Sequence, residues 1–146
     1  MRDVHVTVAT VVERDGRFLF VEETIGARTV LNQPAGHWEA GETLAEAAVR
    51  ETLEETAWEV EPTALLGTYN FEPPDLGYGF LRFAFLAVPK RHHPDRALDP
   101  GIVQAVWLSP AELRRQAGRH RSPMVQRCID DALAGHRYPL TLAANL

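Results

Sequence analysis

One glycine and five charged residues stand at set intervals within one segment, and they constrain this chain more than any other feature of its sequence. The segment reads GHWEAGETLAEAAVRETLEE, starting at residue 36. The six are Gly36, Glu42, Arg50, Glu51, Glu54 and Glu55. An amphipathic helix requires a periodic pattern of apolar residues, but it does not require these polar positions. The segment must therefore be explained by what its charged side chains do.

A helix is predicted over most of this segment. Thr43 followed by Glu46 has the form of a capping box, in which each residue's side chain satisfies a backbone N–H of the other. The helix is expected to begin near Thr43 and to end near Thr56. It is therefore expected to place every charged residue from position 46 to position 55 on a rigid frame.

Three carboxylates, those of Glu51, Glu54 and Glu55, fall within an arc of roughly 100° on that helix. Like charges at this spacing repel by about a few tenths of a kcal/mol per pair, and by more when they are partly buried. A bound cation would reverse the sign of this interaction. Because hard oxygen ligands suit Mg²⁺, the segment predicts a Mg²⁺ site that holds a diphosphate, with Mn²⁺ as a substitute.

A solvated acidic helix without a ligand is the alternative, and it is the commoner origin of Glu-rich runs. It would explain the carboxylates, but it would not explain their spacing from Gly36 and Glu42. Arg50 can balance part of the negative charge and hold one carboxylate by a charge-assisted hydrogen bond. The spacing as a whole favours the metal site.

These residues resemble the Nudix box, the pattern G-x5-E-x7-R-E-U-x-E-E-x-G-U, in which U is a bulky aliphatic residue. Gly36 and all five charged positions match the pattern. Thr52 and Trp58 stand where an aliphatic residue is usual, and Ala57 replaces the last glycine. That glycine would end the helix in a left-handed conformation, which costs an alanine about 1 kcal/mol. The departures affect the end of the helix, because none of the three residues would supply a ligand.

The resemblance implies the Nudix fold, an α/β (α+β) structure in which a mixed central sheet lies between helices as an α/β/α sandwich. One domain is expected over residues 1–146. Strands are predicted at Val4–Val12, Phe18–Glu23, Val30–Gln33, Val60–Phe71, Tyr78–Val88 and Ile102–Leu108. Further helices are predicted at residues 109–117 and 122–134, and Pro34–Gly41 is expected to be a loop.

The resemblance also implies roles for the charged residues. Mg²⁺ is expected to be held by Glu51, Glu55 and Glu54, helped by the Gly36 carbonyl, and to activate an attacking water. Glu54 is favoured slightly over Glu51 as the general base, and Arg50 completes the catalytic group. Asp95 and Asp99 are candidates for an additional acid from a later loop.

Several residues are candidates for contacting the substrate. They are Asn32, Gln33, His37 and Trp38 near the predicted metal loop, Arg28 and Arg82 for phosphate, and Tyr69, Phe71 and Tyr78 for stacking on a ring. Packed core aromatics and solvated arginines are the ordinary alternatives. The predicted helix start at Ser122, flanked by Arg119 and Arg121, is another candidate anion site.

Short blocks outside the box resemble the phosphatase NudJ branch of the family. They are His5–Ala9, Val21–Thr24, Asn32–His37, Leu81–Phe83, Arg121–Pro123 and Arg137–Leu140. The resemblance implies hydrolysis of nucleoside tri- and diphosphates and of thiamine-pathway pyrophosphates such as hydroxymethylpyrimidine pyrophosphate and thiamine pyrophosphate. The alternatives are a Nudix diphosphatase for nucleotide sugars or dinucleoside polyphosphates, and a ligand-sensing module without turnover, which the complete set of glutamates disfavours.

Composition narrows the expected partners and location. The chain has 45% hydrophobic and 24% charged residues and a net charge of −5, as in a globular protein with no basic face for a nucleic acid polymer. It contains no apolar run long enough to cross a bilayer and no signal peptide, so a cytoplasmic location is expected. The expected partner is a small phosphorylated substrate, and both a monomer and a homodimer remain open.

Overall fold

The centre of the fold is β1 (Asp3–Arg14), which pairs with strands on both of its edges. The computed structural model describes residues 2–146. β1 runs parallel to β6 (Tyr78–His92) and antiparallel to the short β4 (Ala35–His37). Since parallel strands cannot be joined by a tight turn, the chain between β1 and β6 must cross over, and α1 lies within this connection.

The remaining strands extend the sheet on either side of β1 and β6. β2 (Arg17–Ile25) pairs antiparallel with both β3 (Arg28–Asn32) and β7 (Ile102–Leu108), and β5 (Trp58–Phe71) pairs antiparallel with β6. The path through the sheet is β3-β2-β1-β6-β5, with β4 added on β1 and β7 on β2. The predicted mixed sheet is confirmed.

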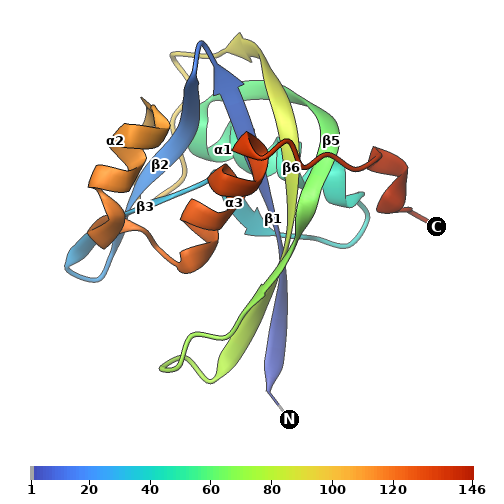
Figure 1. Ribbon diagram of the computed structural model, residues 1–146, viewed down its shortest axis with the longest axis horizontal. Coiled ribbons are helices and arrows are strands. Elements are labelled where there is room, and N and C mark those ends of the chain that lie inside the picture. The colour runs from blue at the N-terminus through green and yellow to red at the C-terminus, as the bar shows by residue number, and fades with distance from the viewer. Residues whose placement is uncertain (1) are drawn as a thin grey trace.

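Helices cover both faces of this sheet, as Figure 1 shows with α1 (Leu44–Thr56) on one face and α3 (Pro123–Leu133) on the other. α2 (Pro110–Arg115), the 3₁₀ helix η1 (Ala117–Arg119) and a second one, η2 (Leu140–Leu142), complete the described elements. The predicted α/β/α sandwich is therefore confirmed. In residues 2–146 no helix combines the length and the apolar character that crossing a membrane requires.

Alternation along the strands divides the core between the two faces. Val8 packs with Ala47 and Ala48 of α1, whereas its neighbour Ala9 packs in the cluster that contains Cys128 of α3. Successive residues of a strand point to opposite faces, so one buried strand can serve two layers. This double burial explains why β1 is buried continuously from Thr7 to Val12 rather than at every second residue.

The predicted loop before α1 was wrong in part, because it contains a strand. The Pro34–Gly41 stretch, expected to be a loop, contains β4, whose Gly36 lies opposite Val8 of β1. A three-residue strand has no periodic pattern of its own, so only the pairing with β1 reveals it. The same pairing determines where Gly36 lies relative to α1.

The ends of α1 follow the predicted chemistry. Thr43 Oγ1 accepts a hydrogen bond from Glu46 N, and Thr43 N donates to Glu46 Oε1, both at 3.0 Å, which completes the capping box. The helix ends at Thr56, and Ala57 adopts a left-handed conformation with φ of 63° while its N–H donates to Leu53 O at 2.9 Å. The box therefore keeps its helix-ending conformation without the glycine, at the backbone cost expected for alanine.

The second departure from the box, Thr52, is explained by a buried hydrogen bond to β1. Thr52 Oγ1 donates to Ala48 O at 2.7 Å and lies 2.7 Å from Thr10 Oγ1, and both hydroxyls are fully buried. Thr52 has a single hydroxyl proton, which Ala48 O takes, so Thr10 must be the donor to Thr52. The pair ties α1 to the central strand.

Thr52→Val is therefore expected to destabilise the fold more than Thr10→Val. The first change leaves the Thr10 hydroxyl buried without a partner and should lower the free energy of unfolding by about 1–3 kcal/mol, whereas the second leaves Thr52 its bond to Ala48. Urea denaturation measures both. The double Thr10→Val/Thr52→Val variant is the control and should regain part of the loss. Equal costs for the two single changes would contradict this donor assignment.

Candidate active site

Three carboxylates from two distant segments meet beside α1. Oxygen atoms of Glu51, Glu54 and Asp99 all lie within 4.8 Å of one another. Asp99 is held there because its backbone N–H donates to Glu54 O at 3.0 Å. The last carbonyls of a helix lack partners inside the helix, so the loop before β7 satisfies one of them and delivers an acid.

Arg50 donates hydrogen bonds to two of these three carboxylates. Its Nη1 donates to Glu51 Oε1 at 2.8 Å and to Glu54 Oε2 at 3.3 Å, and its Nη2 donates to the His37 carbonyl at 3.0 Å. Glu42 receives two further bonds, from Nε at 3.0 Å and from Nη2 at 2.7 Å, which hold the pKa of Glu42 below its ordinary value. One guanidinium thus orients three carboxylates and β4, the strand that carries Gly36.

The charge on Glu51 is unfavourable as the structure stands. Burial raises the pKa of Glu51, the bonds from Arg50 oppose that rise, and the negative charges of Glu54 and Asp99 add to it. Crowding of this kind is typical of sites that bind cations, because a cation replaces repulsion by attraction.

Glu55 lies apart from this group. Its Oε1 accepts a hydrogen bond from Ala35 N at 2.9 Å, so the carboxyl group bridges α1 and β4. Burial raises the pKa of Glu55 to about 8, with the charges of Glu23, Glu51 and Asp99 adding to the rise and the Ala35 N–H opposing it. Glu55 faces the pocket described next.

Gly36 is placed against Glu51 by the pairing of β4 with β1. A Cβ atom at position 36 would overlap the carboxylate carbon and both carboxylate oxygens of Glu51. The absence of a side chain, rather than a left-handed backbone, is what this position requires, because no positive φ is found there.

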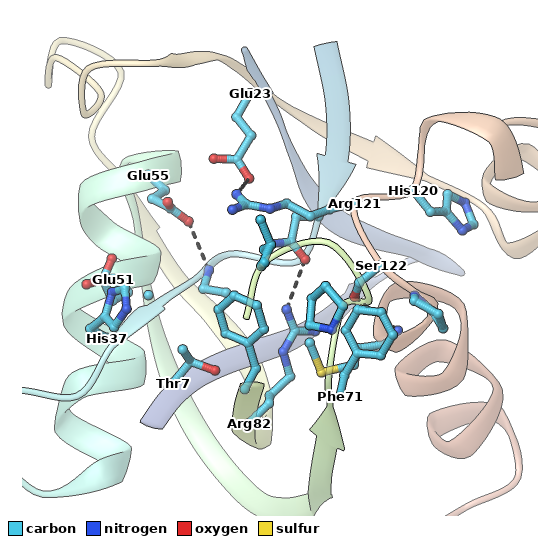
Figure 2. Close-up of a pocket in the computed structure, with 18 of the residues that line it drawn as sticks. Thr7, Glu23, His37, Glu51, Glu55, Phe71, Arg82, His120, Arg121 and Ser122 are labelled. Carbon is cyan, nitrogen blue, oxygen red and sulfur yellow. Dashed lines mark hydrogen bonds and ion pairs between the residues drawn. The ribbon is translucent and has the colours of Figure 1, made fainter. Parts of the chain in front are cut away.

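A pocket of about 760 Å³ opens beside the carboxylates (Figure 2). Glu51, Glu55 and Glu23 line one side, and Arg82 lies at its base. Arg121 lies next to Glu23, with which it forms an ion pair at 2.6 Å, and Ser122, the N-cap of α3, lies on the opposite side. The apolar lining consists mainly of Phe71, Pro73, Leu76, Phe80, Pro123 and Met124.

The structure brings some of the predicted substrate residues to this pocket and not others. Asn32, His37, Phe71 and Arg82 line it together with Gly36. Gln33 is fully buried behind Arg82, to which it is hydrogen-bonded. Four of the candidates lie outside the pocket wall: Arg28 donates to Gly118 O, Trp38 donates to Glu42 O, Tyr69 donates to Asp131, and Tyr78 stacks on His5.

The sequence did not single out Glu23 and Phe80, which line the pocket. Phe80 lies two residues before Arg82 on β6, so strand alternation places both on the same face. That spacing was a usable signal once Arg82 was a candidate. Glu23 had no such signal, because its ion pair with Arg121 joins residues far apart in the chain.

The family model for the NUDIX domain matches residues 1–128. The chain belongs to the Nudix family. This Nudix chain is 44% identical over 141 residues to the protein named Phosphatase NudJ of Escherichia coli strain K12, a match that covers 97% of the chain and 91% of that relative. The sequence-based resemblance to the Nudix family and its NudJ branch is confirmed, and the chain is a Nudix hydrolase.

Solved structures agree with this assignment. A NUDIX hydrolase from Nitrosomonas europaea is 44% identical, superposes with a TM-score of 0.96, and the match covers 99% of this Nudix chain and 98% of that one. A MutT NUDIX hydrolase from Burkholderia pseudomallei is 19% identical with a TM-score of 0.69, over 88% and 98% of the two chains, and shows the shared fold alone. A Nudix hydrolase acts on small phosphorylated compounds, so the acidic group and the pocket beside it form the candidate active site.

Proposed function

We propose that this Nudix hydrolase cleaves phosphoanhydride bonds in nucleoside tri- and diphosphates and in thiamine-pathway pyrophosphates, with Mg²⁺ as its cofactor and Mn²⁺ as a substitute. One observation carries the proposal: Glu51 belongs both to the three-carboxylate group and to the pocket wall. Phosphates held at the acidic group would therefore leave the rest of the substrate inside the pocket. The 44% identity to a protein named Phosphatase NudJ supports the same class of substrate.

The donor set fits a hard divalent cation. Carboxylate oxygens of Glu51, Glu54 and Asp99 converge, and the backbone of Gly36 lies directly against Glu51. We assign the cation to these three carboxylates and the Gly36 carbonyl, with Glu55 beside them. The cation would supply activation of the attacking water and neutralisation of charge on the transferred phosphoryl group.

This grouping changes the assignment of the general base. Glu54, favoured from the sequence, takes part in the three-carboxylate group and, among residues 2–146, is not part of the pocket wall, whereas Glu55 is. We therefore assign Glu54 to cation binding and proton removal from the attacking water to Glu55. Arg50 keeps Glu51 and Glu54 oriented throughout, because it donates to both.

The base assignment is tested by pH profiles. Glu55→Gln is expected to lower kcat on the order of 10²–10⁴-fold and to remove the acidic limb of the kcat profile, because the group that must lose a proton is gone. Glu54→Gln should instead raise the Mg²⁺ concentration needed for half-maximal activity. The reverse pattern would return the role of base to Glu54.

The pocket suits a flat ring attached to the phosphates. Phe71 and Phe80 provide aromatic surface, and Leu76 and Met124 add apolar contact. Ring stacking on aromatic side chains favours nucleobases and the pyrimidine of thiamine precursors. The proposed partner is thus a small molecule rather than a nucleic acid polymer, bound by one domain over residues 1–146 that acts in the cytoplasm as a monomer or homodimer.

Metal removal tests the proposed function. With Mg²⁺ present, phosphate or pyrophosphate release is expected from nucleoside triphosphates and from thiamine pyrophosphate, and the released product separates the two cleavage modes. EDTA should abolish release, and added Mg²⁺ should restore it. Mg²⁺ alone should also raise the Tm of the wild type but not of Glu51→Gln, because a ligand that binds only the folded state stabilises it. Turnover that is insensitive to EDTA would refute the proposed role of the acidic group.

A further inference from the structure

Arg82 is a buried cation at the base of the pocket, and its partners are all neutral. It is 3% exposed, and no ion pair to Arg82 occurs within residues 2–146. Nη1 donates to Gln33 Oε1 at 2.9 Å and lies 3.8 Å from Cys128 Sγ, Nη2 donates to Asn32 Oδ1 at 3.0 Å, and Nε has no hydrogen-bond partner in this part of the chain. Burying an arginine without a carboxylate partner is energetically unfavourable. Arg82 is therefore expected to have a role, and its hydrogen bonds to Asn32 and Gln33 indicate which one.

A guanidinium only donates hydrogen bonds, so it determines which way each amide points. Asn32 and Gln33 must turn their oxygens toward Arg82, because the opposite orientation would place an N–H₂ group against N–H donors. The N–H₂ of Gln33 then donates to Val125 O at 2.8 Å, so both ends of the Gln33 amide are hydrogen-bonded within the protein. In Figure 2 the dashed line above Arg82 is its hydrogen bond to Asn32, and it points toward the centre of the pocket.

The N–H₂ of Asn32 is left to face the cavity. Asn32 lines the pocket, is 8% exposed, and makes no hydrogen bond through Nδ2 to any of residues 2–146. An asparagine that is free to rotate can offer either a donor or an acceptor to a ligand. This one presents a donor to the cavity, in a pocket that is lined by charged residues and by apolar residues such as Phe71 and Phe80.

We propose that Arg82 is a positioning residue that holds the Asn32 amide as a fixed donor, so that Asn32 selects substrate rings with a carbonyl acceptor over rings with an amino group in its place. The inference rests on the proposed function, because it assumes that a nucleobase occupies the pocket. Where the ring offers an amino group, two donors face each other and both lose their bonds to water. Discrimination by one such bond is about fivefold to tenfold.

The test compares nucleotides that differ by one exchange of carbonyl for amino group. In the wild type, kcat/KM is expected to be about fivefold to tenfold higher for UTP than for CTP, or for ITP than for ATP. Asn32→Asp keeps the shape of the side chain, gives Arg82 a negatively charged partner, and removes the N–H₂ donor. It should abolish or reverse that preference while the Tm stays equal or rises. Asn70→Asp, an exposed change of the same charge on β5, is the control and should keep the wild-type ratio.

Variants at Arg82 test the positioning role. Arg82→Met frees the amide of Asn32 to rotate, so kcat/KM should fall for UTP and rise for CTP, and Arg82→Lys should keep part of the wild-type ratio. A purely structural role would lower both values together. Equal rates within both pairs in the wild type, or an unchanged preference in Asn32→Asp, would overturn the inference.

Binding measurements separate this inference from the proposed function. If neither the four nucleotides nor thiamine pyrophosphate is hydrolysed, the proposed function fails. Dissociation constants of the imidotriphosphate analogues of UTP and CTP, measured by calorimetry, then decide the inference independently. A wild-type preference for the UTP analogue that Asn32→Asp removes would support it, and equal affinities would contradict it.

Discussion

Glu51→Gln is expected to lower kcat on the order of 10³-fold while leaving the protein as stable as the wild type or more stable. The activity falls because Glu51 links the acidic group to the pocket, and a neutral amide is a poor ligand for Mg²⁺. Stability should not fall, because burial and the charges of Glu54 and Asp99 already disfavour the ionised form of Glu51. Phosphate release and thermal unfolding measure the two effects.

The sign of the stability change follows from the direction of the pKa shift. When the pKa of a carboxyl group is raised in the folded state, the protein loses stability as pH rises through that raised value. At neutral pH an uncharged replacement therefore removes the free-energy cost of ionising Glu51 in the folded protein. The amide can still accept the hydrogen bond from Arg50. Glu61→Gln, an exposed isosteric change on β5, is the matched control and should change neither quantity. Near-normal turnover in Glu51→Gln would remove the basis of the proposed mechanism.

Gly36→Ala is expected to abolish most activity, by about 10²-fold or more, with little change in Tm. The added methyl group would occupy the space of the Glu51 carboxylate. Because that carboxylate is the end of a flexible side chain, the clash can be relieved by rotation of Glu51 rather than by movement of the backbone. The rotation would remove Glu51 from Glu54 and Asp99, so function should be lost without unfolding.

Gly118→Ala provides the control for this prediction. Gly118 lies in η1, and a Cβ atom there would meet no atom within 4 Å. Its activity and Tm should match those of the wild type. If Gly36→Ala were instead unstable but fully active when folded, the close approach to Glu51 would be a packing feature without a role in catalysis.

Local chemistry was predicted well because it is contained in a few neighbouring residues. The capping box of Thr43 and Glu46, the end of α1 at Thr56 and the strand Ile102–Leu108 all lie where the sequence placed them. Helix caps and strand alternation depend on residues within one or two turns of each other, so a single sequence contains all of their determinants. Ala57 illustrates the limit, since its left-handed conformation persists although the residue type disfavours it.

The aromatic candidates show where residue type stops being informative. Phe71 lines the pocket, whereas Tyr69 points to Asp131 and Tyr78 stacks on His5 at 4.4 Å between ring centroids. All three lie on the same two strands and resemble one another chemically. Strand alternation and register also place all three on one face of the sheet. Which part of that face borders the pocket depends on where α3 and the β5–β6 connection pack, and no local pattern predicts that.

The fold class, the family and the six positions of the Nudix box could all be predicted from the sequence, and four of these positions lie on one helix whose regular spacing specifies their geometry. Only the tertiary structure decided that Asp99 joins Glu51 and Glu54, that β4 brings Gly36 against Glu51, and that Arg82 orients Asn32. Each of these contacts joins segments that are far apart in the chain. They form only when the sheet and its helices bury their apolar faces together, and that collective packing is not written in any short stretch of residues.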